Sequence, residues 1–150
     1  MKQRHKAREY ALQGLYMYEV SKSTIENIIE FEWLDANISK NTEEFAVQLI
    51  EGVISELENI DSVIKDYSKN WRFERISVID KSILRLAIFE MLFMKDIPSV
   101  VTINECIDLG KTFGGENSGQ FINGILDAVK KNKLKEINSN KDDKFCDNNT

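Results

Sequence analysis

The chain has 150 residues, a net charge of −5 and a hydrophobic content of 42%, which are ordinary values for one soluble globular domain. A single proline and seven glycines argue against an all-β fold, and no apolar run approaches membrane-spanning length. A charged amphipathic segment follows the basic start, where a signal peptide would have an apolar core, so we expect a cytoplasmic protein. Cys106 lies in a helical pattern and Cys146 in a polar tail, which fits a reducing compartment without a disulfide.

Apolar residues recur at helical spacing along most of the chain, which predicts an all-α fold of about seven helices. In the first helix Ala7, Ala11 and Leu15 share one face, and Thr24 can cap the second. In chain order, the predicted elements are a helix over 3–20, a short helix over 25–31, a helix that carries Phe45 to Leu57, a short helix from Asn59 or Asp61 to Tyr67, a connector over 68–76, and helices over 78–94, 100–113 and 118–131.

The helix over 78–94 is apolar around most of its circumference, which is typical of the central helix of a bundle. Pro98 turns the chain after it, and a Gly-Gly pair at 114–115 ends the following helix. We expect residues 1–132 to form a single helical domain. Residues 133–150 are polar and nearly unpatterned, so we expect them to form a disordered tail.

Basic side chains are concentrated at the start of the first predicted helix. Lys2, Arg4, Lys6 and Arg8 supply +4 to a chain whose net charge is −5, so the remainder carries −9. Cations are mildly unfavourable at a helix N-terminus, by roughly 0.3–1 kcal/mol each when exposed, so they indicate a function such as polyanion binding. A solvated, frayed terminus is the simpler alternative.

The residues that would support catalysis or metal binding are missing from the pattern. The chain has one histidine, His5, and two separated cysteines, and their spacing fits no zinc site. The sequence GKT at 110–112 lacks the earlier glycine of a phosphate-binding loop, because Glu105 occupies that position. We therefore expect neither an enzyme nor a cofactor.

Three stretches together resemble the NusB family of bacterial transcription antitermination factors. They are KAREYALQGLY at 6–16, VIDKSILRLAIFEM at 78–91 and DIPSVVTINECIDLGKTFGGENSGQFINGIL at 96–126. The resemblance runs from about residue 4 to residue 130. It implies two packed three-helix bundles without catalytic activity. It also implies that the protein binds single-stranded boxA RNA with NusE, a small-subunit ribosomal protein, in an antitermination complex with RNA polymerase, notably in ribosomal RNA operons.

The resemblance assigns RNA contacts to the basic helix start and to the central helix. Arg4, His5, Lys6 and Arg8 match the basic run of the family, although His5 stands where arginine is frequent. The remaining candidates are Tyr16, Lys81, Arg85 and Asn123. Each has an alternative: a core-edge tyrosine for the first, a salt-bridge lattice with Asp80 or Glu90 for the two cations, and a buried amide that holds neighbouring backbone for the last.

A second set of candidates would face the protein partner. Asp80 can cap a helix through Ser77 and, by resemblance, also lies in the region that faces NusE. Phe113, before two glycines, is a candidate exposed contact, whereas Phe121 has the pattern of a core residue. Glu116 and Asn117 complete the set, to cap a helix or face a partner. The family often has aspartate where Asn117 stands.

Two other functions fit the same pattern. One is a protein-interaction module or chaperone in ribosome assembly that uses the same surface. The other is the RNA-recognition domain of an RNA methyltransferase, for which 150 residues leave no room for a catalytic domain. The sequence leaves open whether the free protein forms a homodimer.

Overall fold

The structure is a computed structural model that describes the backbone of residues 2–34 and 37–147, and the side chains of residues 3–34 and 37–132. The described part contains seven α-helices, one 3₁₀ helix and no strand, so the all-α prediction is confirmed. The elements are α1 (Lys2–Val20), α2 (Ile25–Ile29), α3 (Lys40–Ser55), α4 (Leu57–Tyr67), η1 (Phe73–Arg75), α5 (Val78–Phe93), α6 (Ser99–Phe113) and α7 (Ser118–Asp147).

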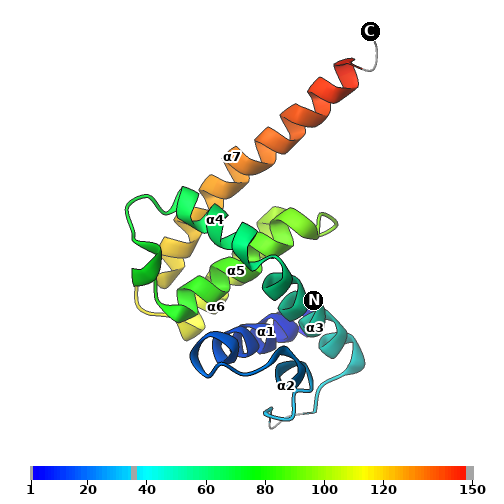
Figure 1. The fold of residues 1–150 in the computed structure, drawn as a ribbon, viewed down its shortest axis with the longest axis vertical. Coiled ribbons are helices and arrows are strands. Elements are labelled where there is room, and N and C mark those ends of the chain that lie inside the picture. The colour runs from blue at the N-terminus through cyan, green and yellow to red at the C-terminus, as the bar shows by residue number, and fades with distance from the viewer. Residues whose placement is uncertain (1, 35–36, 148–150) are drawn as a thin grey trace.

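Helix α5 lies at the centre of the molecule (Figure 1). Helices α1, α2 and α3 pack against one another on one side of it, and α4, α6 and α7 pack around it on the other. Every residue of α5 from Lys81 to Met91 is buried, as expected for a helix with apolar residues on most of its circumference. The central position of α5 predicted from the sequence is therefore confirmed.

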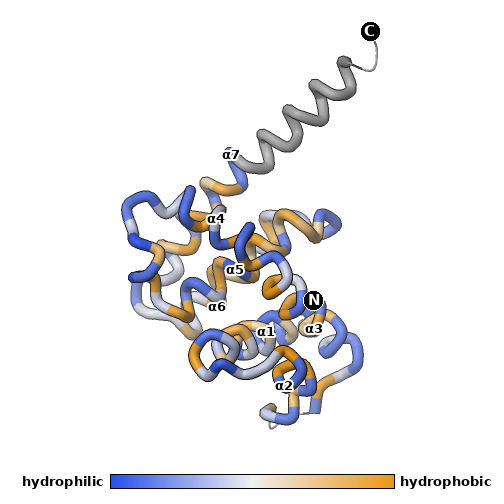
Figure 2. The backbone as a smooth tube through the Cα atoms, viewed as in Figure 1, coloured by the Kyte–Doolittle hydropathy of each residue, from blue (hydrophilic) through white to orange (hydrophobic). Residues whose placement is uncertain are grey.

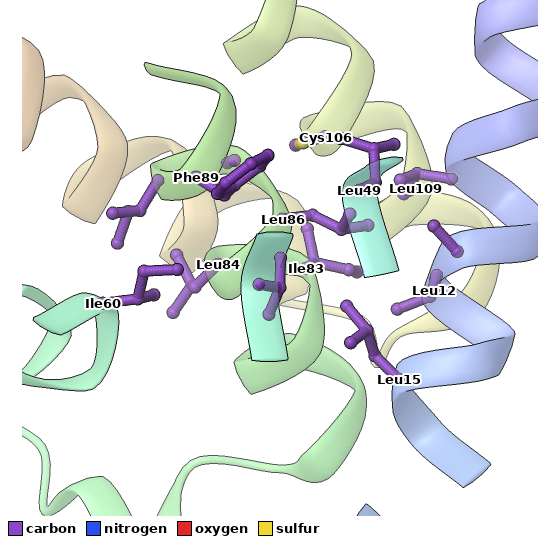
Figure 3. Close-up of a cluster of buried hydrophobic side chains, with 14 of the residues drawn as sticks. Leu12, Leu15, Leu49, Ile60, Ile83, Leu84, Leu86, Phe89, Cys106 and Leu109 are labelled. Atoms are coloured by element: carbon purple, nitrogen blue, oxygen red, sulfur yellow. The ribbon is translucent and has the colours of Figure 1, made fainter. Parts of the chain in front are cut away.

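One hydrophobic cluster joins the two groups of helices. Figure 3 shows Ile83 and Leu86 of α5 in the middle of this cluster. Leu12 and Leu15 of α1 lie on one side, and Ile60 of α4 lies on the other. Since each of these side chains is at most 3% exposed, α1 is anchored to the centre of the fold through its second half.

Side-chain hydroxyls cap several helices. Thr24, Ser39 and Ser77 each accept a hydrogen bond from a backbone N–H three residues later, at 3.1 to 3.2 Å. A glycine allows the close approach of α3 and α5, because a Cβ at Gly52 would lie 2.1 Å from Cζ of Phe89.

Four helix boundaries differ from the prediction. Helix α3 ends at Ser55, so the predicted extension of this helix to Leu57 is wrong. Helix α2 ends earlier, because the chain reaches Phe31 in the left-handed region with φ of 55°. Helix α4 begins already at Leu57, so the predicted start at Asn59 or Asp61 is wrong. Helix α7 continues to Asp147, because residues 132–147 contain neither proline nor glycine to end it. The side chains of residues 133–150 lie outside the described part, so the predicted separate tail stays a prediction.

None of the helices in the described part is both long and apolar enough to cross a membrane.

Candidate nucleic-acid and partner interface

Two of the predicted RNA contacts are exposed at the start of α1. The guanidinium of Arg4 lies over the ring of Phe45, 5.0 Å from its centroid. Lys6 places Nζ 3.4 Å from Oε2 of Glu9, in an ion pair open to solvent. Because exposed pairs of this kind hold a side chain weakly, both cations remain accessible to an anionic ligand.

His5 lies between two carboxylates. Its Nδ1 is 2.6 Å from Oε2 of Glu105 on α6, and its Nε2 is 3.2 Å from Oε1 of Glu9. The ring therefore bridges α1 and α6. The side chain is still 37% exposed, so an RNA contact by His5 stays a prediction.

Arg8 is only 2% exposed. Its Nε and Nη2 donate to the two carboxylate oxygens of Glu90 on α5, both at 2.8 Å, and Thr102 on α6 donates to the same carboxylate at 3.0 Å. Burial alone would lower the pKa of Arg8, but its hydrogen bond to Glu90 and the carboxylate charges hold that pKa above its ordinary value. The prediction that Arg8 contacts phosphate is wrong, because this guanidinium is enclosed and already paired.

Lys81 and Arg85 form a second internal ion-pair cluster, with Glu19 of α1 and Asp61 of α4. Arg85 donates to both oxygens of Asp61, at 2.8 and 2.9 Å, and also pairs with Glu19. Nζ of Lys81 lies 3.7 Å from Glu19. Both cations are 7% exposed, so the predicted second phosphate patch is wrong. The alternative of a salt-bridge lattice holds, with Glu19 and Asp61 as partners in place of Asp80 or Glu90.

Tyr16 and Phe113 come together at the surface, although one was predicted for RNA and the other for a protein. They are 39% and 38% exposed and line one cavity of about 360 Å³. The rest of the lining is Leu12, Gln13, Met17, Trp33 and Ile79. A largely apolar hollow with two exposed aromatic rings can receive an apolar side chain or a base.

The other predicted partner residues gather around a second cavity, of about 450 Å³. Asp80, Glu116, Asn117 and Phe121 all line it, from α5, the α6–α7 turn and α7. The backbone N–H of Asp80 donates to Oγ of Ser77 at 3.1 Å, so half of the predicted capping box is present. Oδ1 of Asp80 is buried without a hydrogen-bond partner in the described part, which leaves an acceptor available to a partner.

Two predicted residues have other surroundings than expected. Phe121 is half-buried and not a full core residue, because it packs at the surface against Trp71, with ring centroids 5.6 Å apart at 80°. Asn123 is exposed on α7, so the expected buried amide is wrong. Sequence reasoning missed Trp71, which is 61% exposed. A tryptophan within a polar connector, between Lys69 and Arg72, was the signal that could have identified it.

Comparison with known proteins gives a consistent result. The model of the NusB family matches residues 5–131. The transcription antitermination protein NusB of Syntrophus aciditrophicus is 49% identical over 142 residues, which cover 91% of this chain and 88% of that protein. The protein of the same name from Myxococcus xanthus is 45% identical, covering 84% of this chain and 93% of that one.

Two solved structures share the fold. NusB of T. maritima superimposes with a TM-score of 0.79 at 42% identity, covering 86% of this chain and 91% of that one. A crystal structure of antitermination factors NusB and NusE in complex with double-stranded RNA contains a chain with a TM-score of 0.74 at 26% identity, covering 87% of this chain and 98% of that one.

Proposed function

The chain belongs to the NusB family of transcription antitermination factors, which are not enzymes, and we propose that it binds boxA-type RNA together with the ribosomal protein NusE. The pair would join RNA polymerase and allow it to read through terminators, notably in ribosomal RNA operons. This work takes place in the cytoplasm, where the nascent RNA emerges. The family relationship supports this function more strongly than any single side chain does.

The grouping of the predicted partner residues is the structural observation that carries the proposal. Asp80 and Glu116 bring two carboxylates, and Arg75 one cation, to a single cavity that the half-buried ring of Phe121 also lines. Two carboxylates beside apolar side chains suit a partner that presents basic groups next to an apolar anchor. We assign NusE to this surface and to the neighbouring hollow of Phe113.

A gel-shift titration tests the function. The RNA probes are a boxA-type single strand and a scrambled strand of equal length, each with and without NusE. We expect NusE to tighten binding to boxA more than to the scrambled strand. Equal enhancement of both would favour the ribosome-assembly chaperone, and no binding of either probe would contradict the proposal. Light scattering of the same protein preparation, without RNA or NusE, reports whether the free protein forms a homodimer.

Charge reversal tests the partner surface. Asp80→Lys should weaken association with NusE, whereas Glu51→Lys, an equal reversal on an exposed position of α3, should leave it unchanged. Asp80→Asn keeps the shape of the side chain and separates lost charge from distorted packing. If the Asp80→Lys variant melts normally and binds NusE with unchanged affinity, Asp80 only stabilises the N-terminus of α5, and its assignment to the NusE interface is wrong.

A further inference from the structure

The segment 65–75, KDYSKNWRFER, links α4 to α5 and carries the most exposed large hydrophobic side chain of the described part. That residue is Trp71, which is 61% exposed. The segment after α4 forms the hydrophilic loop at the left of Figure 2. The indole contacts the ring of Phe121, with the ring centroids 5.6 Å apart at 80°. A ring exposed to this degree is available to stack on a ligand.

Cavities adjoin Trp71 on more than one side. One of about 980 Å³ extends towards α7, and one of about 420 Å³ extends towards Lys65 and Arg72. Both are lined by Ser68, Lys69 and Trp71. Ser68 is 3% exposed, and its Oγ has no hydrogen-bond partner in the described part of the chain. A buried hydroxyl without a partner indicates that a polar ligand atom or a water completes the site.

The charge of the segment opposes that of the whole protein. Its four basic and two acidic side chains give a net charge of +2 in a chain of −5. Lys69 and Arg72 are exposed, and neither pairs with a carboxylate in the described part. By contrast, Arg8 and Arg85 are buried in ion pairs. Of these cations, the two in the segment are therefore the ones available to an anionic partner.

We propose that the segment 65–75 is a single-stranded RNA subsite in which one base stacks on Trp71 and the neighbouring phosphates contact Lys69 and Arg72. The subsite rests on the proposed RNA-binding function and deepens it. Aromatic rings flanked by cations are the usual means of binding single strands without reading their sequence. Amide side chains of Asn70 and Gln120 line the larger cavity and can hydrogen-bond the edges of a splayed base.

A protein partner fits this place less well than RNA does. Protein interfaces have a dehydrated apolar core with few charges. Here the cavity beside the indole is lined mostly by polar side chains, among them Lys69, Asn70 and Arg72. Trp71 and Arg75 also line the cavity that contains Asp80, so RNA on the segment and a protein at Asp80 would meet at the indole.

Intrinsic fluorescence provides a direct test, because the chain has only two tryptophans. Trp33 is half-buried, and its Nε1 donates to the carbonyl of Ile28 at 2.9 Å. The variant Trp33→Phe leaves Trp71 as the only indole. Titration of this variant with boxA-type RNA, and with oligouridine of equal length, should quench its emission in both cases, because stacking tolerates any base.

Affinity measurements on the full chain complete the test. Trp71→Ala should weaken binding of both RNA probes by roughly 5- to 150-fold, as expected when one stacked base is lost. Trp71→Phe should recover much of the affinity. Phe93→Ala is the matched control, since Phe93 is 47% exposed at the opposite end of α5, and it should leave the affinity unchanged.

The outcomes separate this subsite from the function on which it rests. If the unchanged protein binds RNA but Trp71 is not quenched and Trp71→Ala binds normally, the subsite is wrong and the function stands. If no RNA binds with or without NusE, both are wrong. If Trp71→Ala, with a normal melting curve, weakens NusE association in the absence of RNA, Trp71 is a protein contact and the subsite is overturned.

Discussion

Basic side chains concentrate in two segments, the start of α1 and the segment 65–75, and the fold surrounds them differently. Arg8 in the first segment is enclosed with Glu90, at two distances of 2.8 Å. Lys69 and Arg72 in the second are exposed, without an ion pair in the described part. A run of cations thus predicts a polyanion site only where the fold leaves the charged groups exposed to solvent. The enclosed cations stabilise the fold, and the exposed ones remain accessible to an anionic ligand.

Removal of the carboxylate of Glu90 should cause the largest loss of stability, because this carboxylate pairs with Arg8 in the first segment. Glu90→Ala leaves the Arg8 guanidinium buried without a counter-charge, which costs about 3–5 kcal/mol of unfolding free energy. Chemical denaturation measures it. Asp127→Ala is the control, because its pair with Lys131 is exposed and should contribute under about 1 kcal/mol.

The double variant Arg8→Met with Glu90→Leu distinguishes an unpaired charge from a lost contact. Since apolar side chains of similar size replace a buried pair at little cost, it should recover most of the stability. A Glu90→Ala protein that unfolds like the control would show that Arg8 is not held as described, and that it stays available to RNA.

The second ion-pair cluster should have a smaller effect. Asp61→Ala removes both hydrogen bonds that Arg85 donates to Asp61, but Arg85 keeps Glu19, and Asp61 is itself 17% exposed. We expect a loss of about 1.5–3 kcal/mol, as for hydrogen bonds to charged groups. Denaturation at neutral pH measures it, and an unchanged stability would contradict the assignment of Arg85 to the fold.

The same cluster should make stability depend on pH. Burial raises the pKa of Glu19, but hydrogen bonds and charges from Arg85 and Lys81 outweigh it and lower that pKa below its ordinary 4.5. The stabilisation is therefore complete above pH 4.5 and is lost as the pH falls through the lower, folded pKa. Melting curves across this range should fall less steeply for Glu19→Gln than for the unchanged protein. Identical curves would contradict this account of Glu19.

The exposed cations of α1 should affect stability least. Replacement of Arg4 and Lys6 by glutamine should change the unfolding free energy by less than about 1 kcal/mol, because their contacts are open to solvent. If the two contact RNA, affinity should fall alike for boxA and scrambled strands, since phosphate contacts position without reading sequence. Thermal melting and an RNA titration on one preparation measure both. A much lower melting temperature would show that Arg4 and Lys6 stabilise the fold, as Arg8 does.

The helices could be predicted from their apolar spacing, because a buried stripe at helical period has few other solutions. The burial of Arg8 was also available in the sequence. It shares a helical face with Ala11, Leu12 and Leu15, at intervals of three, four and seven residues. Charge counted along the chain does not show on which side of a helix each cation lies, and this separates Arg8 from Arg4 and Lys6.

The ion-pair partners could not be predicted in the same way. Glu90 lies 82 positions from Arg8, and Asp61 lies 24 positions from Arg85, so only the packing of whole helices brings them together. Trp71 lies in the connector, outside any periodic pattern. Its exposure depends on where Phe121 and α7 pass, which no local pattern contains.

The dependence of RNA affinity on salt tests the division of the cations most directly. Each phosphate contact of a single strand contributes about 0.7 to the slope of log K against log salt. The double variant Lys69→Gln with Arg72→Gln should therefore lower the magnitude of this slope by about 1.4, whereas Lys95→Gln, at the far end of α5, should leave it unchanged. A double variant with unchanged slope and affinity would contradict the account, because RNA would then bind without the unpaired cations of the segment 65–75.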